Sequence, residues 1–314
     1  MSANAIRRSA FLASAGAAVA LPAVARAADP VNVAIIPGDA AGTPYYAQQL
    51  GYFKPAGLDV NLQVLAAGPA IASAIVGGTI DIGAVNTGSL ASARLRGLPL
   101  RALAPANLIG SRPAADTIIV AKESTIRSGA DLAGKTIAIN STGTVQHAAA
   151  LAWIEAQNGD PKAVKFLELP VPAMPAAIVA GRVDGGICGE PYVSEAAATT
   201  RSLGPIYDAM HKPFLLFCLC ASERWLQSNA AAASAFADVM RRSSAWANAR
   251  QNEAQRRQFN VTLTKLDPQV IAKMTLAEMG TSLDAPLIAP VIDVMLKYGF
   301  LSHTVNVGDM IWHA

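Results

Sequence analysis

Apolar and polar positions along the chain repeat one pattern twice. Residues 70–86 (AIASAIVGGTIDIGAVN) and 173–189 (AMPAAIVAGRVDGGICG) share an apolar triplet, a glycine, an aspartate and a second glycine, about 103 residues apart. In each copy the spacing predicts a helix that ends at a glycine and is followed by a short buried strand. One α/β unit is therefore expected twice, which indicates two similar lobes. Clefts between lobes are common sites for small molecules.

Strand and helix patterns alternate on either side of the repeated segment. Thr43-Pro44 is typical of a helix start, with threonine as N-cap and proline at the first helical position. From residue 135 the same order of elements begins again. This alternation favours the α/β class, with a mainly parallel sheet covered by helices in each lobe. We expect strands at 31–36, 58–65, 100–104, 135–139 and 164–169, and helices at 43–51, 88–96 and 145–156.

Two further apolar runs, at 117–121 and in FLLFCLC at 214–220, predict strands where the chain crosses between the lobes. We therefore assign residues 28–115 and 213–314 to lobe 1 and residues 116–212 to lobe 2. Everything after Ser222 is helical in pattern. The arginines of this region are interleaved with polar residues, which predicts solvated helix faces; they are Arg224, Arg241, Arg242, Arg250, Arg256 and Arg257.

Composition indicates a folded protein, because 52% of the 314 residues are apolar and 15% are charged. Residues 1–27 read as an export signal: Arg7-Arg8 precede an apolar run, and Ala25-Arg26-Ala27 provides a small-x-small cleavage pattern. The arginine pair resembles a twin-arginine signal, and an ordinary secretory signal is the alternative. Without these residues the basic and acidic side chains balance, so no basic face for nucleic acid is expected.

The sequence also predicts the compartment of the protein and the state of its three cysteines. No cysteine lies near the cleavage point and no later segment is apolar enough to span a membrane, so we expect a periplasmic protein without a lipid anchor. Cys218 and Cys220 alternate on one face of a strand, and Cys188 ends the second repeated strand. Their neighbours are apolar and no histidine stands at metal-ligand spacing, which predicts buried, inert thiols and no metal or cofactor.

Several landmarks of the chain resemble a known family. They are YYA at 45–47, GYF at 51–53, GLDV at 57–60, GTIDIG at 78–83, DLAGK at 131–135 and EPY at 190–192. In this order they resemble the periplasmic solute-binding proteins for nitrate, sulfonate and taurine, whose superfamily includes the thiamine-pyrimidine binders. The similarity covers nearly the whole chain after the export signal. It implies a two-lobed type II periplasmic binding protein fold that closes on a ligand and delivers it to an ABC importer.

The ligand site can be located by topology. Ligands of open α/β sheets bind beyond the carboxyl ends of strands, where loops lead into helix N-termini. Loops of this kind are expected at 38–46, 67–69, 86–89, 140–144 and 189–192. The candidate ligand-binding residues are Gly42, Thr43, Tyr45, Tyr46, Gly68, Asn86, Thr87, Ser141, Thr142, Gly143, Thr144, Glu190 and Tyr192.

The residue types in these loops favour some classes of ligand over others. They contain no lysine or arginine, which favours an anion held by helix termini and hydroxyls over a carboxylate clamped by arginine. Glu190 either projects into the cleft toward an ammonium or ring N–H or caps its own helix. A zwitterion such as an aminosulfonate would use both halves of the site. Tyr45 or Tyr46 is expected to contact the ligand, and His147 is expected at the surface or in the core. The repeated Asp81 and Asp184 suggest a shared structural role.

The leading hypothesis is the solute-binding subunit of an ABC importer. It would act as a monomer beside permease and ATPase subunits, and capture a small anionic or zwitterionic solute of the sulfonate or taurine type by hinge closure. Alternatives are a binder of a pyrimidine or other heterocyclic solute, a sensory binding protein, and an enzyme of the thiamine-pyrimidine synthase type. The export signal opposes the enzyme, and no hydrolase, metalloprotease or dinucleotide motif is present in the sequence.

Overall fold

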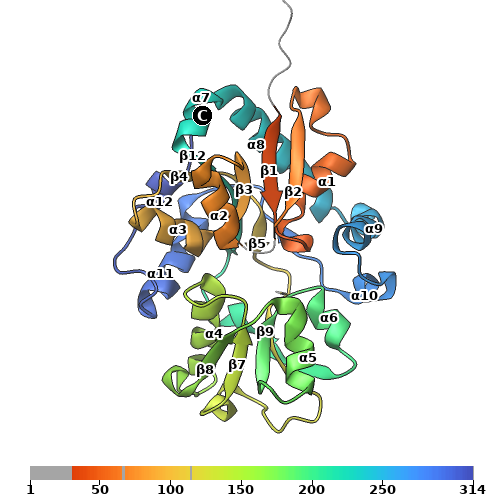
Figure 1. The fold of residues 1–314 in the computed structure, drawn as a ribbon, viewed down its shortest axis with the longest axis vertical. Coiled ribbons are helices and arrows are strands. Elements are labelled where there is room, and N and C mark those ends of the chain that lie inside the picture. The colour runs from red at the N-terminus through yellow and green to blue at the C-terminus, as the bar shows by residue number, and fades with distance from the viewer. Residues whose placement is uncertain (1–29, 66–67, 114, 314) are drawn as a thin grey trace, which may run out of the picture.

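Two five-stranded sheets, one above the other, form the framework of the molecule (Figure 1). The computed structural model describes residues 30–65, 68–113 and 115–313, so the predicted export signal at 1–27 lies outside the described residues. The first sheet has the order β2–β1–β3–β12–β4. Its strands are β1 (Val31–Ile35), β2 (Val60–Val64), β3 (Ile82–Asn86), β4 (Leu100–Pro105) and β12 (Phe217–Ser222).

The second sheet repeats this arrangement strand by strand, in the order β8–β7–β9–β6–β10. In the first sheet β1 lies parallel to β2 and β3, and in the second sheet β7 lies parallel to β8 and β9. In each sheet an antiparallel strand pairs with the far edge of this parallel group. The antiparallel strand is β12 in the first sheet and β6 in the second. The bounds are β6 (Thr117–Ala121), β7 (Thr136–Ile139), β8 (Lys165–Glu168), β9 (Gly185–Cys188) and β10 (Thr200–Pro205).

The repeated segment builds equivalent parts of the two sheets. Helices α2 (Gly68–Gly77) and α5 (Met174–Val179) lead into β3 and β9. Asp81 Oδ2 accepts a hydrogen bond from the backbone N–H of Asn32 at 2.8 Å, and Asp184 Oδ2 accepts one from Thr136 at 2.8 Å. Each aspartate therefore joins the start of its own strand to the start of the neighbouring strand. The expected structural role of this pair is confirmed.

Helices cover both sheets. Helix α1 begins at Thr43, but Gly42 is its N-cap, so the sequence placed this cap one residue late. The strand β13 (Glu278–Met279) interrupts the region after Ser222 that was expected to be wholly helical. The helices are α1 (Thr43–Gln49), α3 (Thr87–Leu95), α4 (Val145–Ala156), α6 (Tyr192–Ala196), α7 (Glu223–Ser228), α8 (Ala230–Asn248), α9 (Glu253–Thr264), α10 (Pro268–Lys273), α11 (Ala289–Lys297) and α12 (Val307–Met310).

A small antiparallel sheet connects the two large ones. Its order is β11–β5–β13, with β5 at Asn107–Ile109 and β11 at Phe214–Leu215. The chain leaves the first sheet through β5 and returns through β11, and β5 lies between the sheets in Figure 1. The C-terminal helices span the same gap, because α11 packs against α3 and α4, and α10 packs against α6.

The three cysteines are free and buried, as the sequence indicated. Cys218 and Cys220 lie on one face of β12 with their sulfur atoms 3.4 Å apart. Burial raises the pKa of the Cys188 thiol to about 12, and the negative charge of Asp116 adds to this effect. Among the described residues, no helix combines the length and the apolar character needed to cross a membrane.

Candidate functional site

A cavity of about 200 Å³ lies between the two sheets. Its walls come from loops that follow the carboxyl ends of strands in both sheets, where α/β proteins bind ligands. Residues 36–41 follow β1, and Asn86 and Ser89 lie at the end of β3. On the opposite side, Asn140 and Ser141 follow β7. The cavity therefore occupies the position that topology predicts for a ligand.

Six of the predicted site residues line this cavity: Gly68, Asn86, Ser141, Thr144, Glu190 and Tyr192. Two of them also cap helices at the cavity wall. Asn86 Oδ1 accepts a hydrogen bond from Ser89 N at 2.9 Å, and Thr144 Oγ1 accepts one from His147 N at 3.3 Å. The loops that begin α3 and α4 are thus fixed by their own side chains.

The predicted tyrosines lie elsewhere. Helix α1 packs against α8 and α9, which turns Tyr46 into the core, where its side chain is fully buried. The ring of Tyr46 stacks with Phe259 at a centroid distance of 6.2 Å, and Tyr45 meets the same ring edge-on at 6.5 Å. Neither tyrosine belongs to the cavity lining. The expectation that Tyr45 or Tyr46 lies where it would contact the ligand is therefore wrong.

Thr43 and Thr87 are likewise fully buried outside the lining. Ser243 donates a hydrogen bond to the Thr43 carbonyl, and Thr87 Oγ1 donates one to the Leu215 carbonyl, both at 2.7 Å. Gly42 lies so close to the Tyr46 ring that a Cβ would stand 2.6 Å from it.

The remaining two predicted residues turn toward the exposed side of their loop. Thr142 donates to Glu168 through both its backbone N–H and its hydroxyl, at 2.7 and 2.6 Å. Gly143, with φ of 69°, donates its N–H to His147 Nδ1 at 3.2 Å. His147 itself is buried, and its ring lies 4.3 Å from that of Phe166 between centroids.

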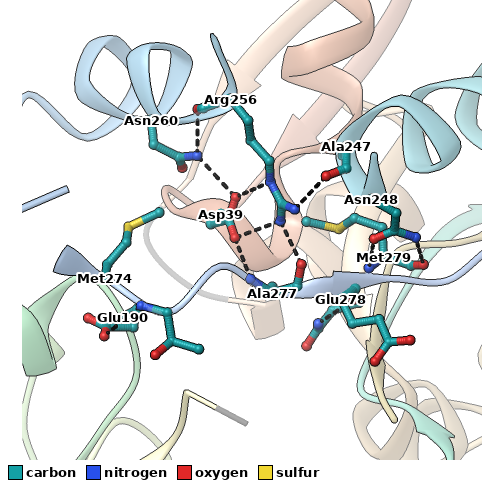
Figure 2. A network of polar contacts seen from close by, with 12 residues as sticks. Asp39, Glu190, Ala247, Asn248, Arg256, Asn260, Met274, Ala277, Glu278 and Met279 are labelled. Carbon is teal, nitrogen blue, oxygen red and sulfur yellow. Dashed lines mark hydrogen bonds and ion pairs between the residues drawn. The ribbon is translucent and has the colours of Figure 1, made fainter. Parts of the chain in front are cut away.

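Asp39, on the cavity wall, is the centre of a buried polar network (Figure 2). Arg256 donates to both carboxylate oxygens, from Nε at 2.8 Å and from Nη2 at 2.7 Å. Tyr46 and Asn260 donate to the same carboxylate at 2.5 and 3.0 Å. Arg256 is fully buried, so its predicted place on a solvated helix face is wrong. The charge of Asp39 is compensated inside the protein.

Residues 274–279, here called the strap, connect this network to the other side of the cavity. The Ala277 N–H donates to Asp39 Oδ2 at 2.6 Å, and Arg256 donates to the Ala277 carbonyl at 2.7 Å. Two residues earlier, the Thr275 N–H donates to Glu190 Oε1 at 3.1 Å. The strap therefore joins the loop after β1 to the loop after β9, as Figure 2 shows.

Glu190 lies on the cavity wall and also accepts hydrogen bonds from the start of its own helix. Its Oε2 accepts from the backbone N–H of Ser194 at 3.0 Å, and its Oε1 accepts from the Ser194 hydroxyl at 2.9 Å. It thus satisfies the first turn of α6 and also lines the cavity. All three of its donors, including Thr275, are neutral.

Asp116 also lines the cavity, and sequence reasoning missed it. It stands directly before β6, and its Oδ1 accepts from Gln146 Nε2 at 2.6 Å. Burial raises the pKa of Asp116 to about 6; the hydrogen bond from Gln146 lowers this pKa, and the charge of Glu190 raises it. Among the described residues, neither lysine nor arginine lines the cavity.

Comparison with known structures defines the class of the fold. The chain has the two-lobed α/β fold of periplasmic binding proteins. The alkanesulfonate-binding protein SsuA from Xanthomonas axonopodis pv. citri matches with a TM-score of 0.75 at 22% identity, over 92% of this chain and 100% of that chain. The nitrate-binding protein NrtA from Synechocystis matches with a TM-score of 0.73 at 15% identity, over 88% and 83%.

Sequence comparison identifies the family. The chain belongs to the family described as NMT1/THI5 like, whose profile matches residues 41–254. A taurine-binding periplasmic protein from Escherichia coli (strain K12) is 30% identical over 176 residues, which is 56% of this chain and 53% of that protein. The matched region thus spans about half the length of this relative.

Proposed function

We propose that the chain is the extracytoplasmic solute-binding subunit of an ABC importer. The observation that carries this proposal is the cavity of about 200 Å³, which is walled by strand-end loops from both sheets. A ligand in such a cavity contacts both halves of the molecule, so it stabilises the form in which the halves are closed. That closed form is what a permease with its ATPase would recognise.

The predicted lobes, residues 28–115 with 213–314 and residues 116–212, are the moving parts in this proposal. Each contains one complete five-stranded sheet, and two strands of the small sheet carry the crossings. The protein would work as a periplasmic monomer without a catalytic role, since its task is capture and delivery of an unchanged solute.

A small zwitterionic solute of the taurine or sulfonate type fits the cavity best. Asn86, Ser89 and Ser141 provide neutral hydrogen-bonding groups near the starts of α3 and α4, where helix N-termini favour an anion. Glu190 provides a carboxylate for an ammonium group. The taurine-binding relative supports the same class.

A heterocyclic solute is the second candidate. Tyr192, Tyr207 and Phe217 all line the cavity, and aromatic rings of this kind can pack against a planar ligand. A carboxylate such as Glu190 would accept a hydrogen bond from a ring N–H or an exocyclic amine.

A thermal-shift panel tests the proposal, because a ligand that binds the folded protein raises its melting temperature by mass action. The panel contains taurine, ethanesulfonate, nitrate and an aminopyrimidine, each at millimolar concentration. Taurine is expected to give the largest rise. Scattering of the same samples should show a smaller radius of gyration with the active compound.

Two variants provide the specificity control. Ser141→Trp introduces a large ring at the cavity wall and should abolish the shift, whereas Thr142→Trp places the same ring at the exposed neighbouring position, outside the lining. The proposal fails if no compound stabilises the wild type, or if Ser141→Trp responds as the wild type does.

A further inference from the structure

Three carboxylates line the cavity, and they differ in how their charge is compensated. Asp39 forms a two-pronged ion pair with the buried Arg256. Asp116 and Glu190 form no ion pair in the described part of the chain. Asp116 and Glu190 are half-buried. Carboxylates that are partly withdrawn from water without a compensating charge are costly, so proteins pair them, protonate them or use them to hold a cation. The cavity therefore carries an excess of negative charge.

Of Asp116 and Glu190, Asp116 accepts fewer hydrogen bonds. Glu190 accepts three hydrogen bonds, from Ser194 and the strap, whereas Asp116 accepts one, from Gln146. The loop after β9 leaves room for the Asp116 carboxylate, because a Cβ on Gly189 would lie 3.1 Å from its Oδ1. The second oxygen of Asp116 receives no hydrogen bond from the described residues. It is thus available as a hydrogen-bond acceptor at the cavity wall.

We infer that Asp116 is the specificity-determining residue of the site and binds a protonated nitrogen of the solute, an ammonium or amidinium group. Glu190 lies on the same cavity wall and adds a second negative charge near this nitrogen. This inference rests on the proposed solute-binding function and narrows its ligand class. Purely anionic solutes such as nitrate or simple sulfonates should bind more weakly than zwitterions, because they would meet two uncompensated carboxylates.

The described groups near Asp116 carry no positive charge that would compensate its carboxylate. Tyr207 and Cys188 both face it, and burial together with the charge of Asp116 raises the pKa of each well above neutrality. Gln146 is neutral. Glu190 is the other carboxylate that faces Asp116. An ammonium group that enters the cavity above pH 6, where Asp116 is ionised, therefore meets a negative environment.

Binding of a matched pair of probes tests the inference. Taurine and isethionate have the same sulfonate and chain length, but isethionate has a hydroxyl in place of the ammonium. The wild type should bind taurine at least about 30-fold more tightly by calorimetry, because truncating a buried charge contact costs 2–5 kcal/mol. Asp116→Asn keeps an acceptor for Gln146 and should lose most of that preference. Glu195→Gln, an exposed change on α6 outside the lining, should retain it.

The stability of the ligand-free protein gives a second readout that does not depend on the probes. Because Asp116 is an uncompensated carboxylate whose pKa is raised to about 6, Asp116→Asn should raise the melting temperature at pH 8 by several degrees. This gain should shrink to about a third at pH 4.5, where the folded-state carboxyl is protonated. Glu195→Gln should change little at either pH. Equal taurine and isethionate affinities in the wild type, or a loss of stability in Asp116→Asn that is the same at both pH values, would overturn the inference. The stability gain without binding of either probe would support the subsite and refute the proposed sulfonate class.

Discussion

Replacing Arg256 by methionine removes the positive charge that compensates Asp39. Methionine has a similar length and fills the space, so the change isolates the charge and its hydrogen bonds. In the wild type, Arg256 donates to both oxygens of Asp39 and to the carbonyls of Ala247 and Ala277. The variant leaves the Asp39 carboxylate buried with neutral donors alone.

The structure sets the size of the effect. Arg256 is fully buried and Asp39 is 3% exposed, so solvent does not screen the pair. Breaking a buried pair by removing one partner costs about 3–5 kcal/mol of unfolding free energy. Asp39→Asn is expected to cost a similar amount, because it strands the guanidinium. The double variant Asp39→Asn/Arg256→Met carries neither charge, so it should be less destabilised than the sum of the single variants by about 2 kcal/mol.

Urea unfolding followed by tryptophan fluorescence measures these effects, and Trp246 lies in the same cluster, 6.0 Å from the Tyr46 ring between centroids. Arg241→Met is the matched control, because Arg241 pairs with Asp238 on the exposed face of α8 and should change stability by about 0.5 kcal/mol or less. The reasoning is refuted if Arg256→Met unfolds within about 1 kcal/mol of the control. Strict additivity in the double variant would also count against it.

Three further outcomes follow from the structure. A Cβ on Gly83 would stand 2.2 Å from Ile71, whereas one on Gly186 would meet its neighbours at 3.4 Å, so Gly83→Ala should lower the melting temperature clearly and Gly186→Ala only slightly. Burial lowers the pKa of His147 to about 4, although Glu168 raises it. Stability should therefore fall by up to about 3 kcal/mol as the pH drops from 6.5 to 4, and His147→Gln should flatten this dependence in denaturant titrations. A thiol reagent at pH 8 should label none of the three buried cysteines in the native protein and all three after denaturation; native labelling would contradict their burial.

The alternation of strands and helices and the duplicated unit could be predicted from the sequence, because both depend on residues that are close together in the chain. The spacing in each repeat contains the helix, the terminating glycine and the strand within a few residues. Asp81 and Asp184 could be assigned a structural role for the same reason, since their recurrence at equivalent strand starts has a local cause. The position of the cavity followed from topology, and Asn86, Ser141 and Glu190 line it.

The directions of side chains required contacts that are remote in the chain. Tyr46 follows a strand end, as a ligand contact would, but α8 and α9 pack over it and turn its face inward. Arg256 resembles its exposed neighbours in sequence, and its partner Asp39 lies 217 residues away. Asp116 stands in an irregular segment without a motif. The sequence feature that could have indicated Asp116 is its position as a charged residue directly before an apolar crossing strand.

The place of β12 in the first sheet has a consequence for the order of folding. This strand, at 217–222, lies between β3 and β4, whereas all five strands of the second sheet fall within 117–205. As the chain emerges from the ribosome, the second sheet is therefore complete while the first still lacks an inner strand. Pairing of β12 must also close a loop that contains the whole second sheet, and such distant contacts form slowly. The part of the protein that is synthesised first is thus the part that is finished last.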